Sequence, residues 1–178
     1  GGLITVPFLF FIFEALNLDK TYIMHLSVGT SFSIIIPTAM VSVLTHRKNK
    51  YVDFNIIKTY GIFVIIGVLA GTIFAAYMQT KTLVLFFSLV VYFLGTYLLL
   101  NQSNSREIKK KITILPKLVF GFISGFVSAP MGIGGAVMNV PVLRYFGYPI
   151  KKAIGSAAAI GFIIASFGAL GFMISGSF

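Results

Sequence analysis

Residues 128–141 carry the residue types in this chain that are best suited to bind an anion. The segment runs Ser-Ala-Pro-Met-Gly-Ile-Gly-Gly-Ala-Val-Met-Asn-Val-Pro inside an apolar stretch over 115–146. Backbone that leaves a helix inside lipid must be covered by protein or line a water-filled cavity, and such breaks mark binding sites in secondary transporters. A half-helix that begins near Gly134 or Gly135 offers unpaired N–H groups and the positive end of its dipole. These bind an anion without any charged side chain. We therefore take Gly132, Gly134 and Gly135 as candidate substrate-binding residues, with a kink that serves helix packing as the alternative.

A shorter copy of this pattern opens the chain. Residues 1–7, Gly-Gly-Leu-Ile-Thr-Val-Pro, align with residues 135–141, Gly-Ala-Val-Met-Asn-Val-Pro. Further along, Gly29-Thr30 aligns with Gly155-Ser156 in the same order. Internal repeats of this kind are typical of transporter folds. The pattern predicts two related halves and a second helix start, with Gly1 and Gly2 as further candidate binding residues.

Five polar side chains are candidate donors to a bound anion. Thr5 and Asn139 lie about one turn into the two half-helices, and Thr30, Ser31 and Ser156 lie near the starts of the following spans. A buried amide in lipid costs several kcal/mol without partners, so Asn139 either contacts substrate or bonds another helix. The hydroxyl groups have an alternative as well, because they can bond carbonyls of the preceding turn.

Other kinds of site find no support in the sequence. Gly132-Ile133-Gly134-Gly135 is no dinucleotide loop, because residue 137 is valine and no strand precedes it. The two histidines and four carboxylates are not placed at metal-ligand spacing. There is no cysteine, and no Ser/His/Asp or paired-acid arrangement is visible. We expect neither an enzyme nor a metal or cofactor site.

The composition is that of a membrane protein. The 178 residues are 57% hydrophobic and only 10% charged, whereas about 25% of residues are charged in soluble domains. Four windows are apolar and long enough to span a bilayer: Met24–Thr45, Ile56–Met78, Thr82–Leu100 and Lys152–Ile174. The net charge of +10 comes from basic residues between these windows. They indicate membrane topology and do not predict nucleic-acid binding.

Charge also decides between two topologies for the broken segment. If the segment dips into the membrane and returns, 12 of the 14 Lys and Arg residues lie on one face, in or beside loops 46–55, 101–117 and 144–152. If it crosses, Arg144, Lys151 and Lys152 move to the other face. The positive-inside rule favours the re-entrant arrangement and a cytoplasmic position for the three loops. Residues 1–100 and 118–178 are then two halves inverted in the membrane and joined by a basic linker at 101–117.

Together these motifs resemble the sulfite exporter TauE/SafE family, also called toluene sulfonate uptake permeases. That family has a glycine cluster followed by Val-Pro twice, each with a downstream Gly-Thr-Ser or similar triplet. Here the triplets are Gly-Thr-Ser at 29–31 and Gly-Ser-Ala at 155–157. Departures are Ala136 in place of a third glycine and Ser-Ala in place of Thr-Ser. Family members are longer, so the resemblance implies that the first half lacks its start and the second half its last spans.

The resemblance implies transport of sulfur-containing anions, such as sulfite, sulfonates or sulfoacetate, across the bacterial inner membrane. We expect an all-α polytopic membrane protein of two inverted repeats, each with a broken or re-entrant segment and spanning helices. It would move a small anion by alternating access, with that anion and membrane lipid as its partners. The alternative is a non-transporting scaffold or membrane subunit whose glycines serve helix packing only.

Overall fold

The computed structural model describes residues 1–100 and 114–175, and in these ranges the chain forms seven helices and no strand. The helices are α1 (Gly2–Ala15), α2 (Ile23–Lys48), α3 (Phe54–Ala76), α4 (Thr80–Leu100), α5 (Ile114–Met131), α6 (Ala136–Tyr145) and α7 (Ile150–Ser175). Five of them, α2, α3, α4, α5 and α7, are long and apolar enough to cross a membrane. The all-helical, polytopic class predicted from the sequence is confirmed.

The four predicted spans correspond to α2, α3, α4 and α7, with ends that differ by three residues at most. The broken segment differs more from expectation. The second half was predicted to begin at residue 118, but α5 is 18 residues long and begins inside the predicted linker 101–117. The rest of that linker, 101–113, lies outside the described residues. Pro130 does not stop α5 early, and the helix ends only at the glycines that follow Met131.

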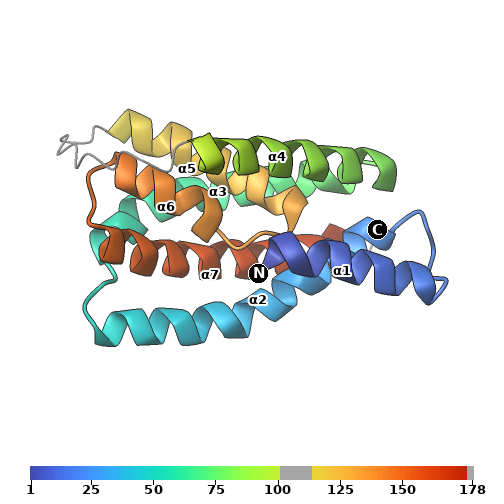
Figure 1. Cartoon of the computed structure of the whole chain (residues 1–178), viewed down its shortest axis with the longest axis horizontal. Coiled ribbons are helices and arrows are strands. Elements are labelled where there is room, and N and C mark those ends of the chain that lie inside the picture. The colour runs from blue at the N-terminus through green and yellow to red at the C-terminus, as the bar shows by residue number, and fades with distance from the viewer. Residues whose placement is uncertain (101–113, 176–178) are drawn as a thin grey trace.

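Helices α5 and α6 form a hairpin around the predicted break. Residues 132–135 separate them, and Gly132 has a φ of +60°, a conformation that favours glycine. Ser124 on α5 donates to Oδ1 of Asn139 on α6 at 2.8 Å, so the two helices lie side by side. Figure 1 shows α6 running back toward the end of the molecule at which α5 began. The same end holds the α2–α3 and α6–α7 connections.

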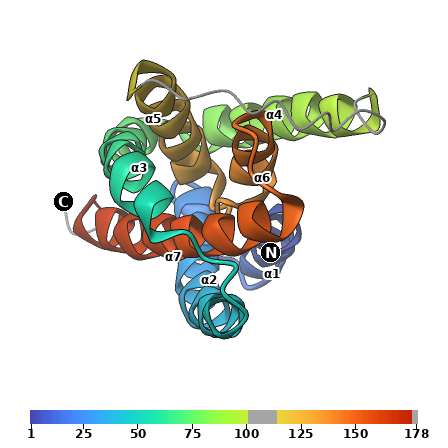
Figure 2. The ribbon, with the colours of Figure 1, turned by 90° about the vertical axis from the view of Figure 1, so that its left-hand side faces the viewer.

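Helix α1 begins in the middle of the molecule, beside the start of α6. From there the two helices run toward opposite ends of the structure (Figure 1). The long α7 lies between α2, α3 and α6 and packs against all three (Figure 2). Its small residues, such as Gly161 and Gly168, let these neighbours approach closely.

Helices α3 and α5 make the closest helix pair, because each presents glycines to the other. A Cβ built on Gly71 would lie 2.9 Å from Cβ of Ala129, and one built on Gly125 would lie 2.9 Å from N of Val68. The Gly67/Gly71 spacing therefore acts as a close-packing motif, as expected for GxxxG sequences. This pair joins α5, and through it the hairpin, to the rest of the core.

We expect Gly125→Val to destabilise the protein by about 1–3 kcal/mol, because the added side chain overpacks a backbone contact. Gly95→Val is the matched control, since no heavy atom lies within 4 Å of a Cβ at Gly95 on α4. Denaturation in detergent measures the free energy of unfolding of both variants. Equal stability of the two variants would contradict the close α3–α5 contact.

Candidate functional site

The two glycine motifs predicted from the sequence meet in space. A Cβ built on Gly2 would collide with the carbonyl oxygen of Gly132 and lie 2.7 Å from Cα of Ile133. Only glycine at position 2 lets the start of α1 approach the loop between α5 and α6 so closely. Segments more than 120 residues apart in the sequence thus form one structural unit.

Both half-helices begin at the aligned positions of the repeat. Gly1 is the N-cap of α1 and Gly135 is the N-cap of α6, and neither start has a side-chain capping bond. The first N–H groups of a helix have no intrahelical partner. They carry the partial positive charge of the helix dipole. Two uncapped helix starts therefore present donors in the same region.

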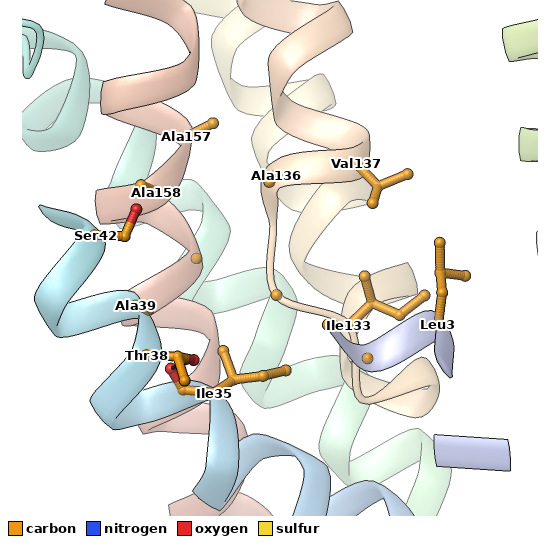
Figure 3. Close-up of a pocket in the computed structure, with 14 residues that line it drawn as sticks. Leu3, Ile35, Thr38, Ala39, Ser42, Ile133, Ala136, Val137, Ala157 and Ala158 are labelled. Atoms are coloured by element: carbon orange, nitrogen blue, oxygen red, sulfur yellow. Dashed lines mark hydrogen bonds between the residues drawn. The ribbon is translucent and has the colours of Figure 1, made fainter. Parts of the chain in front are cut away.

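An open cavity of about 290 Å³ lies at these two helix starts. Its lining comes from α1, α2, α6, α7 and the loop before α6: Gly1, Gly2, Leu3, Ile35, Thr38, Ala39, Ser42, Ile133, Gly134, Ala136, Val137, Ala157, Ala158 and Gly161. Figure 3 shows the α2 residues on one side of the cavity and Ala136, Val137 and Ile133 on the other. None of the described residues that line it is charged. Among them, the side-chain oxygens belong to Thr38 and Ser42.

A chain of hydroxyl bonds holds the wall of this cavity. Ser31 on α2 donates to the carbonyl of Gly132 at 2.9 Å. Because that bond uses the only proton of the Ser31 hydroxyl, Thr5 is the donor in its 2.9 Å bond to Ser31. Both residues were predicted as site residues. The structure brings them beside the cavity, where they fix the loop to α1 and α2 instead of lining the open space.

Asn139 lies behind the cavity and is fully buried. Its Oδ1 accepts from the hydroxyl groups of Tyr60 at 2.7 Å and Ser124 at 2.8 Å, and its Nδ2 donates to Gly135 O at 2.6 Å. Of the two roles left open by the sequence, the structure favours helix bonding. Asn139 joins α3, α5 and α6 and holds the carbonyl of the residue that caps α6.

Two predicted site residues lie elsewhere. Ser156 is buried, and its hydroxyl accepts from the backbone N–H of Asp53 at 3.0 Å, so it holds the start of α3. Thr30 does not line the cavity. The alignment of Gly29-Thr30 with Gly155-Ser156 therefore marks corresponding positions in α2 and α7 without marking a shared contact to the cavity.

Thr38 and Ser42 are lining residues that the sequence motifs did not indicate. With Ser31 and Ile35 they follow the i, i+4, i+7, i+11 spacing of one helix face, which was the available signal. Thr38 donates to the carbonyl of Ile35 at 2.9 Å. Ser42 has no hydrogen-bond partner in the part of the chain that the structure describes, so its hydroxyl is free to face a ligand.

The Asn139 network predicts a measurable coupling. Asn139→Ala leaves the buried hydroxyl of Ser124 without its acceptor and leaves Tyr60 only its longer 3.3 Å bond to the carbonyl of Phe120, which costs about 1–3 kcal/mol. In the Tyr60→Phe background, the bond from Tyr60 to Asn139 is already absent, so the same substitution costs less. A double-mutant cycle from denaturation in detergent measures the difference. Additive effects within about 0.5 kcal/mol would contradict the network.

Comparison with known proteins gives a consistent result. A sequence model described as "Sulfite exporter TauE/SafE" matches residues 1–178. The chain is 28% identical to a "Probable membrane transporter protein" of Haemophilus influenzae, over 99% of this chain and 67% of the relative. It is 26% identical to a protein of Methanocaldococcus jannaschii with the same description, over 96% of this chain and 63% of the relative.

A third relative, from Bacillus subtilis and also described as a probable membrane transporter protein, is 26% identical over 99% of this chain and 71% of its own length. The chain thus spans about two thirds of the relatives it matches. No solved structure matches it significantly. The family match over the whole chain, the all-helical fold and the paired glycine motifs agree: this chain belongs to the sulfite exporter TauE/SafE family of membrane transporters.

Proposed function

We propose that this protein carries small sulfur-containing anions, such as sulfite or sulfonates, across the bacterial inner membrane. The observation that carries the proposal is the convergence of two uncapped helix starts, α1 and α6, on one cavity. Backbone N–H groups and helix dipoles there favour a negative ligand. The cavity volume of about 290 Å³ is at the low end for small-molecule sites, which suits a small anion.

Alternating access between two inverted halves is the proposed mechanism. It is supported by the opposite directions of α1 and α6 (Figure 1) and by their identical register in the sequence repeat. On α2 the cavity is lined by the half nearest Lys48, and on α7 by the half nearest Lys151. The cavity therefore lies toward the end with the basic loops, which we assign to the cytoplasm.

The other end is closed by apolar side chains in this state. Val6, Val28 and Phe32 are fully buried, and Val6 and Val28 lie against Gly132. The Phe32 ring lies 6.2 Å from that of Phe172, centroid to centroid. Movement of these contacts is the step that would expose the cavity to the opposite face.

We expect Gly134→Leu to abolish anion flux without unfolding the protein. A Cβ at Gly134 would lie 3.1 Å from Cγ2 of Ile35 and the rest of the side chain would fill the cavity. Gly95→Leu is the matched control, because its side chain points into open space. Uptake of radiolabelled sulfite and sulfonates into proteoliposomes measures the anion flux of both variants. Flux retained in folded Gly134→Leu would place the route elsewhere, and wild-type protein inert toward every sulfur anion would favour the scaffold alternative.

The re-entrant topology is tested by single cysteines, since this chain has none of its own. We expect Lys48→Cys and Lys152→Cys to react with an impermeant thiol reagent from the same side of the membrane, and Gln79→Cys to react from the other. All three positions are exposed. Labelling of Lys48→Cys and Lys152→Cys from opposite sides would mean that the α5–α6 segment crosses.

A further inference from the structure

A second open cavity, of about 480 Å³, lies at the opposite end of the molecule from the basic loops. It is formed where the α1–α2 connection meets the α3–α4 turn. Its lining residues are Lys20, Thr21, Tyr22, His25, Ala76, Tyr77, Met78, Gln79, Thr80 and Lys81. The two connections are tied together by the Thr80 hydroxyl, which donates to the carbonyl of Thr21.

The charge of this cavity is unusual for its place in the molecule. In the re-entrant topology, Lys20 and Lys81 are the two basic side chains left at this end, and both line the cavity. Neither has a hydrogen bond or ion pair in the described part of the chain. No carboxylate is found among the described residues that line the cavity. Two lysines without a partner among the described residues thus line the same space.

The nearest carboxylate in the sequence is already engaged. Asp19 accepts the backbone N–H of Thr21 at 2.9 Å, and this bond holds the pKa of the Asp19 carboxyl below its usual value. The carboxylate is fully exposed, so water screens its effect on the neighbouring lysine. It therefore does not neutralise the cavity.

The backbone adds donors of the same kind as in the first cavity. Two helices begin at this second cavity, α2 after Tyr22 and α4 at Thr80. The start of α2 has no side-chain capping bond, and within the described residues no side chain accepts from the first-turn N–H groups of α4. The first-turn N–H groups of both helices are thus left without a side-chain acceptor in this part of the chain.

His25 contributes one further polar atom at this end. Its Nε2 lies 3.0 Å from the carbonyl of Ala75, which can only accept, so Nε2 carries the proton. Nδ1 is buried and has no partner within the described residues. Because Nδ1 has almost no accessible surface, a ligand in the cavity would meet it only after the neighbouring side chains move.

We propose that this second cavity binds a small sulfur or phosphorus oxyanion through Lys20, Lys81 and the helix starts of α2 and α4. The ligand is either a free anion or the phosphate of a lipid headgroup. One face of α2 joins the two cavities, from Ser42 and Ile35 through the buried Phe32 to His25. That the transported anion passes through this site rests on the proposed function. Binding of an oxyanion to the site does not rest on it.

Site-resolved labelling of lysine amines tests the proposal. Purified protein in detergent is treated with an amine-acylating reagent, and each lysine is quantified by mass spectrometry. We expect sulfate or methanesulfonate, compared with chloride at equal ionic strength, to slow labelling of Lys20 and Lys81 by about fivefold or more, since a charge-assisted contact occupies the ammonium group. Lys48 and Lys58, exposed at the other end, should be unaffected and serve as internal controls.

Variants and lipid separate the remaining outcomes. Lys20→Gln with Lys81→Gln should weaken anion binding by about tenfold, whereas Lys48→Gln with Lys58→Gln should not. Protection of both lysines only in nanodiscs containing phosphatidylglycerol would support the site and identify the lipid as its ligand. No protection in either setting would overturn the proposal. In Gly134→Leu protein the protection should persist, so failure of transport and failure of this site are distinguishable.

Discussion

The contact between Gly2 and the carbonyl of Gly132 is the constraint on which the rest of the structure depends. Lipid cannot satisfy backbone groups that leave a helix, so a break inside the membrane must be covered by protein. Here each break covers the other, since the start of α1 lies against the loop before α6 with no room for a side chain. Two helix starts are thereby held at mid-molecule, and residues of both line one cavity.

Keeping these helix starts uncapped requires polar support from behind. Thr5, Ser31 and the carbonyl of Gly132 form one set of bonds, and Tyr60, Ser124, Asn139 and the carbonyl of Gly135 form the other. In both sets, side-chain hydroxyl and amide groups donate to backbone or side-chain oxygens. These groups therefore position the backbone near the breaks and do not line the cavity.

Much of the fold was predictable from the sequence, because its signals are strong and local. Apolar runs of about 20 residues gave the spanning helices, and the glycine repeat gave both half-helix starts with the correct register. The first turn of α5 was missed because residues 114–117 were assigned to the basic linker, although they begin the helix. The close packing of α3 on α5 was indicated only by the spacing of Gly67 and Gly71.

The site was less predictable, because residue type does not reveal which way a side chain points. Asn139 had two roles open to it, and only the distances to Tyr60 and Ser124 favour one. Ser156 matched Thr30 in sequence but bonds the backbone of Asp53. Ser42 belongs to none of the sequence motifs. Its place at the cavity follows from helix geometry and from the position of α6, and no local sequence pattern indicates where α6 lies.

The absence of charge from the first cavity has an energetic consequence for transport. A helix start contributes up to about 2 kcal/mol toward a partly buried anion, so two contribute at most about 4 kcal/mol. This limit, taken by itself, corresponds to a dissociation constant of about 1 mM. A buried lysine would need a permanent partner, and an anion filling that role would leave slowly. Backbone donors instead provide binding weak enough to release. Among the described lining residues of the two cavities, the lysines belong to the far one, where water screens their charge.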